Sequence, residues 1–177
     1  MDSINRNQPE DNHQDLQGAD TVRRVQETVK KTQTCFFCTA GGQGPSQGTR
    51  PMSVRKVDDA GNLWFLCAND SHTHEEIGRN PTVELFFQGS EHSDFVHLRG
   101  TALLSRDKQK IEELWEPILR TWFTEGINDP RIAVVQVTPS SGYYWDNKHG
   151  NAVAGIKMMI GAAVGKTLDD SIEGRLS

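Results

Sequence analysis

The sequence predicts an α+β fold in which an antiparallel β-barrel is accompanied by a few peripheral helices. Short runs rich in apolar residues recur along the chain, at 34–40, 49–57, 62–68, 82–88 and 94–104. Stretches rich in glycine, aspartate, serine and proline separate most of these runs. Strands that follow one another so closely favour antiparallel pairing. With 177 residues and no internal repeat, the chain is expected to form one domain.

Charge and hydropathy exclude several classes of function. The formal net charge is −5, but eight of the 24 acidic residues lie in segments 1–20 and 169–177, which leaves 16 acidic and 17 basic residues between them. Such a balance lacks the basic surface of a nucleic-acid-binding protein. No apolar run reaches the roughly 20 residues that span a bilayer, and the first residues do not resemble a signal peptide. We therefore expect a cytoplasmic protein without nucleic-acid or membrane partners.

The N-terminal part begins with a polar segment and a helix. Residues 1–20 have no apolar period, which predicts a disordered arm. Asp20 or Thr21 is expected to cap a helix with three valines at helical spacing. The glycine-rich stretch 41–48 lacks a following Lys-Ser/Thr, so it predicts a flexible hairpin rather than a phosphate-binding loop.

The C-terminal half contains further predicted helices and strands. Asp107 opens an apolar stripe at helical spacing, and Pro117 inside it should kink the helix or split it in two. Strands are expected at 131–137 and 143–145. The last periodic element, 152–164, has an apolar face that is too short to cross a membrane, so it should pack on protein.

The segment 63–77 contains the most specific local signal. An apolar strand ends in small polar residues, and a short helix begins at once. The first turn of a helix has unpaired N–H groups and the positive end of the helix dipole, which attract anions. Ser71 and Thr73 add hydroxyl groups there, and Thr73 with Glu76 has the spacing of a capping box. The pattern fits either an ordinary capped helix or a phosphate site.

The cysteines and histidines predict neither a redox pair nor a metal site. Cys35 and Cys38 have C-x-x-C spacing, but in a strand residues three apart face opposite sides. A redox pair belongs at a helix start and a zinc site needs a second pair of ligands, so two buried strand cysteines are expected. His72 and His74 would diverge by about 200° on a helix, so we expect no metal between them.

Two arginines and two tryptophans suggest a cofactor site. Arg50 and Arg55 lie in the second predicted strand, and Trp122 and Trp145 fall late in otherwise regular elements. Core packing explains most tryptophans. An isoalloxazine ring, however, needs flat apolar contacts, hydrogen bonds to its pyrimidine edge and cations for its phosphate. Both interpretations stay open at this point.

Ordered motifs along the chain resemble the FMN-binding split barrel of pyridoxamine-phosphate-oxidase-like proteins. The first group is Gly48-Thr49-Arg50-Pro51-Met52, Leu63-Trp64-Phe65 with Asp70-Ser71, and Arg79-Asn80-Pro81. The second group resembles the bacterial general stress protein branch and consists of Leu114-Trp115-Glu116-Pro117, Thr121-Trp122-Phe123-Thr124-Glu125-Gly126, Val137-Thr138-Pro139 and Tyr144-Trp145-Asp146. The resemblance covers about 21–166. It implies a split-barrel domain at 21–149, followed by a C-terminal amphipathic helix and tail at 150–177.

The resemblance also implies which residues bind the cofactor. In the family, the position of Arg50 contacts the flavin, that of Arg55 is a cation near it, and a Ser-x-Lys-like motif binds its phosphate. Thr73 stands at the lysine position, so one fixed charge is missing. The implied cofactor-binding set is Arg50, Met52, Arg55, Leu66, Cys67, Ser71, His72, Thr73, Trp122 and Trp145.

For function, the resemblance implies a homodimeric general stress protein with flavin at the subunit interface. FMN, with FAD as the alternative, would supply oxidoreductase chemistry. The segment 150–159 does not resemble the basic segment with which true pyridoxamine-phosphate oxidases bind their substrate, which speaks against vitamin B6 oxidation. No catalytic residue is assigned. Two alternatives stay open: a non-catalytic flavin store or sensor, and a barrel that binds a deazaflavin or haem.

Overall fold

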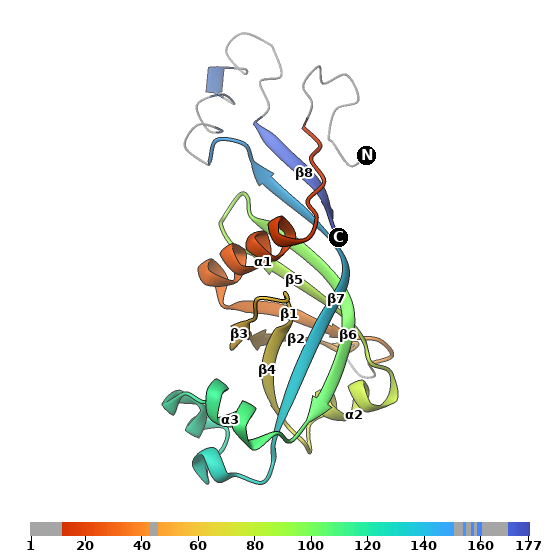
Figure 1. Cartoon of the computed structure of the whole chain (residues 1–177), viewed down its shortest axis with the longest axis vertical. Coiled ribbons are helices and arrows are strands. Elements are labelled where there is room, and N and C mark those ends of the chain that lie inside the picture. The colour runs from red at the N-terminus through yellow and green to blue at the C-terminus, as the bar shows by residue number, and fades with distance from the viewer. Residues whose placement is uncertain (1–11, 43–45, 151–153, 155–156, 158, 161–169) are drawn as a thin grey trace.

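A curled antiparallel sheet forms the body of the protein (Figure 1). The computed structural model describes residues 12–42, 46–150, 154, 157, 159–160 and 170–177. Within them, the sheet has eight strands: seven follow the order β2-β1-β5-β6-β7-β4-β3, and β8 pairs with β7 outside this order. The strands are β1 Thr34–Thr39, β2 Thr49–Ser53, β3 Lys56–Val57, β4 Leu63–Ala68, β5 Thr82–Gln88, β6 Phe95–Ser105, β7 Ile132–Asn147 and β8 Ser171–Leu176. The helices are α1 Ala19–Thr32, α2 His72–Arg79, α3 Lys108–Leu114 and the 3-10 helices η1 Pro117–Thr121 and η2 Gly126–Asn128. The α+β antiparallel expectation is confirmed.

The sheet forms a split barrel because its two end strands are neighbours in sequence. β2 and β3 are separated only by Val54 and Arg55, so the chain passes from one end of the sheet to the other within two residues. The Val54 N–H donates to the Gln33 carbonyl (2.9 Å) and the Arg55 N–H to the Trp64 carbonyl (2.8 Å). The single strand predicted at 49–57 is therefore wrong, since these two residues turn the corner of the barrel.

Alternating side chains fill the barrel interior. Leu63, Phe65 and Cys67 of β4 are buried, whereas their neighbours on the strand are half-buried. Phe65 meets Phe37 of β1 edge to face, with ring centroids 5.3 Å apart. Burying a large apolar side chain contributes about 1.5–3 kcal/mol before conformational entropy is subtracted. In β1, Cys35 is buried and Cys38 half-buried, on opposite faces.

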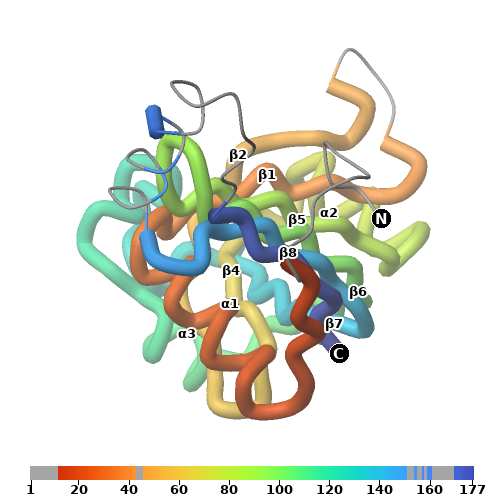
Figure 2. Tube along the Cα trace, turned by 90° about the horizontal axis from the view of Figure 1, so that it is seen from above, coloured from red at the N-terminus to blue at the C-terminus, as the bar shows by residue number. Residues whose placement is uncertain are grey.

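Helix α1 packs on the sheet through Val25 and Val29, as its valine spacing predicts. Its start differs from the prediction, because Gly18 occupies the N-cap and no side chain caps the helix. In Figure 2, which looks down the long axis, α2 and α3 lie to opposite sides of β4. None of the helices within the described residues has the length and apolar character needed to cross a bilayer.

The described parts of the two chain ends, 12–18 and 170–177, lie together, whereas the sequence predicted a disordered arm over 1–20 and a tail after the C-terminal helix. Backbone N–H groups of Gln14, Leu16 and Gly18 donate to carbonyl groups of 173, 175 and 177 at 2.8–2.9 Å. Residues 12–18 are therefore held along β8, and 171–176 form a strand of the main sheet. Residues 1–11 and most of the amphipathic helix predicted at 152–164 lie outside the described residues.

Strand β7 is one long strand where the sequence predicted two short ones. Pro139 lies inside it, opposite Gly100 of β6, where the register of the two strands shifts. Proline lacks an N–H donor and is tolerated in sheets at such irregularities. A Cβ atom on Gly100 would lie 2.4 Å from the Thr138 carbonyl oxygen, so the close approach of the strands requires glycine here.

The helical segment after β6 is split, as Pro117 predicted. Asp107 caps α3 by accepting from the N–H groups of Gln109 and Lys110. The chain leaves the α-helix at Trp115, and Pro117 begins η1. Apolar side chains of α3 and η1 form a second, smaller core against the outer face of the sheet. Its buried members are Ile111, Leu114, Leu119, Phe123, Ile132 and Val134.

Replacing Gly100 by alanine should destabilise the fold. The added methyl group would overlap the backbone of β7, and overpacking of this kind costs about 1–3 kcal/mol. Urea unfolding of Gly100→Ala measures this loss. Gly78→Ala is the matched control, because a Cβ atom added at Gly78 would have no neighbour within 4 Å and α2 gains a better helix former. Equal midpoints for the two variants would contradict the proposed close approach.

Candidate functional site

A cleft between β2, β4 and η1 brings together half of the residues predicted to bind a cofactor. Its volume is about 380 Å³, within the range of small-molecule sites. It is lined by Pro51, Met52, Ser53, Arg55, Leu66, Cys67, Ala68, Leu119, Trp122 and Phe123. The predicted set therefore contributes Met52, Arg55, Leu66, Cys67 and Trp122 to one cleft.

The outer side of this cleft is formed by the segment after α3. Arg55 ties that segment to the barrel: its Nε donates to the Leu114 carbonyl (3.4 Å) and its guanidinium pairs with Glu116 at 2.5 Å. Only 11% of the Arg55 side chain is exposed. Trp122 follows η1 and is 63% exposed, so its indole offers a flat surface at the edge of the cleft.

Cys67 contributes an unreactive thiol. Burial raises the pKa of Cys67 to about 11, so the sulfur is protonated at neutral pH. The nucleophilic form of cysteine is the thiolate. Cys67 is therefore a packing residue at the end of β4, and its backbone leads directly towards the start of α2.

The N-terminus of α2 follows Ala68, the last cleft-lining residue of β4. Ala68 lines the cleft, and its carbonyl accepts hydrogen bonds from both the N–H (3.1 Å) and the hydroxyl (2.5 Å) of Ser71. Ser71 is the N-cap and accepts from the N–H of His74 (3.3 Å). The predicted capping box is wrong, because the helix already begins at His72 and Thr73 lies within it.

Thr73 and Glu76 instead form a polar cluster with Arg50 of β2. Arg50 donates to the Thr73 hydroxyl (2.7 Å) and to the Glu76 carboxylate (2.5 Å), which also accepts from the Thr39 hydroxyl (2.6 Å). The Glu76 side chain is only 7% exposed. Burial favours the neutral acid, but the hydrogen bonds from Thr39 and Arg50 and the charge of Arg50 hold the pKa of Glu76 below its usual value.

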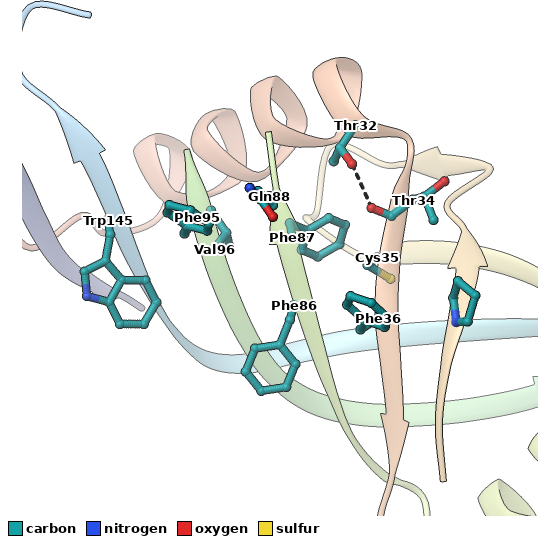
Figure 3. Close-up of a pocket in the computed structure, with 11 residues that line it drawn as sticks. Thr32, Thr34, Cys35, Phe36, Phe86, Phe87, Gln88, Phe95, Val96 and Trp145 are labelled. Atoms are coloured by element: carbon teal, nitrogen blue, oxygen red, sulfur yellow. Dashed lines mark hydrogen bonds between the residues drawn. The ribbon is translucent and has the colours of Figure 1, made fainter. Parts of the chain in front are cut away.

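Two predicted site residues stand apart from this arrangement. The His72 side chain, at the start of α2, is 90% exposed and lies almost entirely in solvent. Trp145 does not reach the cleft within one chain. It lines a second pocket of about 480 Å³ on the outer face of the sheet (Figure 3).

Three residues that line this second pocket belong to a row of mostly aromatic side chains that crosses five strands. Pro51, Phe36, Phe86, His97 and Tyr143 are directly opposite one another in register, from β2 to β7. Phe86 stacks on His97 with ring centroids 4.4 Å apart. Phe36 and Phe86 remain 59% and 41% exposed. We call this surface the aromatic face; Pro51 also lines the cleft, so the two features adjoin.

Sequence reasoning missed Thr39 as a member of the site and assigned Glu76 the wrong partner. No local pattern links Thr39 with Glu76, because they come from β1 and α2 and meet only in the folded sheet. In the cleft wall, Leu119 was detectable only as part of the apolar stripe that follows Asp107, and Phe123 only as part of the motif at 121–126.

Several solved structures share this architecture. A protein from Jannaschia sp. CCS1, provisionally named general stress protein 26, superimposes with a TM-score of 0.73 at 21% identity, covering 90% of this chain and 99% of that one. General stress protein 26 from Bacillus anthracis str. Sterne gives 0.59 at 17% identity, covering 70% and 92%. A general stress FMN/FAD binding protein from Xanthomonas citri gives 0.59 at 21% identity, covering 69% and 84%.

Sequence comparison supports the same relationship. Protein bli-3 of Neurospora crassa is 23% identical over 105 residues, and the match spans 54% of this chain and half the length of that relative. The family model described as pyridoxamine 5'-phosphate oxidase like matches residues 20–169, which is most of the chain. The chain therefore belongs to the pyridoxamine 5'-phosphate oxidase-like family.

Proposed function

We propose that this protein binds a flavin nucleotide, FMN or FAD, in the cleft and acts as an oxidoreductase-like general stress protein. The observation that supports this most is that the cleft-lining residue Ala68 is hydrogen-bonded to Ser71, the N-cap of α2. Leu66 and Trp122 give the cleft apolar surface, and Ser71 and Thr73, with Arg50 bonded to Thr73, lie at the helix N-terminus that follows Ala68 in the chain. Such an arrangement suits a planar ring at one end and a phosphate at the other.

The residues present fit a flavin in their chemistry. Met52, Leu66 and Trp122 would contact the ring system, Arg55 would present a cation beside it, and Arg50 with the first turn of α2 would hold the phosphate. A bound flavin would supply the electron-transfer chemistry. The chain's own part is then to bind and orient the cofactor and to limit the access of water to it.

A flavin store or sensor is the second candidate, and one observation favours it. Among the described residues that line the cleft, the ionisable side chains are Arg55 and Cys67. Arginine stays protonated at physiological pH, and the Cys67 pKa of about 11 keeps its thiol neutral. Neither group can exchange a proton near neutral pH, so the cleft of one chain offers binding groups rather than an acid–base catalyst.

Flavin binding should depend on Arg50 through the phosphate. Removing a charge-assisted hydrogen bond costs about 1.5–3 kcal/mol, or roughly ten- to hundredfold in affinity. Fluorescence titration should therefore show weaker binding of FMN and FAD to Arg50→Ala, with riboflavin unchanged because it has no phosphate. Arg79→Ala, at the exposed far end of α2, is the matched control. An equal loss of affinity for FMN, FAD and riboflavin would contradict the proposed position of the phosphate beside Arg50.

Reduction of the bound flavin by a nicotinamide cofactor distinguishes the two proposed functions, an oxidoreductase and a flavin store or sensor. The flavin-loaded protein is mixed with NADH or NADPH, and the flavin absorbance is followed with and without oxygen. Repeated bleaching and recovery over many cycles supports an oxidoreductase. A flavin that stays oxidised with both donors while remaining bound favours the store or sensor.

We further propose that the protein is a homodimer in which a second copy covers the aromatic face. Phe36 and Phe86 expose large apolar surface there, and exposed patches of this kind mark interaction sites. Because Pro51 lines both this face and the cleft, a partner seated here would border the flavin. This placement would also give Trp145 a role near the cofactor that it lacks within one chain.

A charge on the aromatic face should therefore separate the subunits. Phe86→Glu would bury a carboxylate against apolar rings, which is costly without a paired cation. Light scattering at micromolar concentration should show the monomer mass for this variant and twice that mass for the parent. Lys108→Glu on α3 serves as the control. A parent that binds flavin as a stable monomer would refute the interface.

A further inference from the structure

We propose that Arg131 is a positioning residue for the cleft: held by Asp129, it joins the wall that contains Trp122 to the end of β4 and so fixes where the indole lies beside a bound ring. This role rests on the flavin function proposed above and adds to it a residue that sets the fit of the ring system. Arg131 acts on the flat ring through Trp122, and not on the phosphate.

Two walls of the cleft come from separate parts of the chain. Residues 66–68 of β4 form the first wall, and Leu119, Trp122 and Phe123 form the second. The Phe123 side chain is buried in the second core, whereas the Trp122 side chain is 63% exposed. Core packing therefore fixes Phe123, but the position of the exposed indole depends on how the backbone of Trp122 is held.

The short loop between η2 and β7 bonds to both walls. Asn69 directly follows Ala68, and its N–H donates to the Arg131 carbonyl (2.7 Å) while its side-chain amide donates to the Pro130 carbonyl (3.1 Å). On the other side, the Arg131 guanidinium donates to the Trp122 carbonyl (3.2 Å). The loop thus links the end of β4 to the peptide group that follows Trp122.

Asp129 fixes the guanidinium in this place. Its carboxylate accepts from the backbone N–H (3.0 Å), Nε (3.0 Å) and Nη2 (2.7 Å) of Arg131. The Asp129 side chain is completely buried, and the hydrogen bonds from Arg131 lower the pKa of Asp129 to about 2 in spite of this burial. A buried carboxylate needs such a partner for stability alone. The pairing does not require the further contact from Arg131 to Trp122, and this contact is the one that reaches the cleft wall.

The test measures how tightly riboflavin, which has no phosphate and no charge, binds to the full chain and its variants. Arg131→Lys keeps the charge but loses the planar fork with which Nη2 serves both Asp129 and Trp122. It should weaken riboflavin about fivefold, the size of one aromatic contact. It should also restore part of the flavin fluorescence that a stacked indole quenches. Arg106→Lys, at an exposed arginine after β6, is the matched control and should change neither quantity.

A double-mutant cycle separates positioning from stability. In a chain that already has Trp122→Ala, Arg131→Lys should change the riboflavin affinity by less than about twofold, because the group that it positions is gone. A merely structural role for Arg131 would weaken riboflavin by the same factor with and without Trp122, and this result would overturn the proposal.

A second variant applies if the melting curve shows that Arg131→Lys does not fold. Asn69→Ala removes the bond to Pro130 from the other end of the link, and it should weaken riboflavin about twofold, since one neutral hydrogen bond is lost. Unchanged riboflavin affinity in the folded variants would overturn the role of Arg131 alone. Failure of the parent to bind any flavin would remove the proposed function as well.

Discussion

The two-residue link between β2 and β3 is the constraint on which the rest of the architecture depends. Because Val54 and Arg55 connect the two ends of the sheet, the sheet must curl until those ends approach. Val54 is buried in the core, and Arg55 holds the segment between α3 and η1. The same corner therefore closes the barrel around its apolar interior and positions one wall of the cleft.

The second important feature of the structure is the polar cluster of Arg50, Thr73, Glu76 and Thr39. It joins β2, α2 and β1 through hydrogen bonds of 2.5–2.7 Å in a largely buried position. Charged groups in such a place must be paired, because removing one partner leaves an uncompensated charge. The cluster therefore fixes α2 on the sheet and at the same time limits how much positive charge remains for an anion. The structural role of this cluster and the binding role proposed for Arg50 therefore involve the same residues.

The cleft offers surfaces rather than reactive groups. Cys67 is a neutral thiol, and Arg55 is engaged by Glu116 and by the Leu114 carbonyl. Trp122 and the aromatic face, by contrast, leave large apolar areas exposed on a single chain. The flavin proposed for this cleft would supply the redox chemistry, and the chain would supply shape and flat contacts.

The sequence by itself determined the local elements and much of the candidate site. The alternation in β4, the aspartate cap of α3, the break at Pro117 and the strand-to-helix switch at Ser71 all follow from patterns within a few residues, and the structure confirms them. Only the tertiary structure decided the continuity of β7 through Pro139, the pairing of residues 12–18 with β8, the ion pair of Glu76 with Arg50 and the place of Trp145. These features depend on strand register and on partners far apart in sequence, which periodicity cannot specify because it describes only which face a side chain occupies.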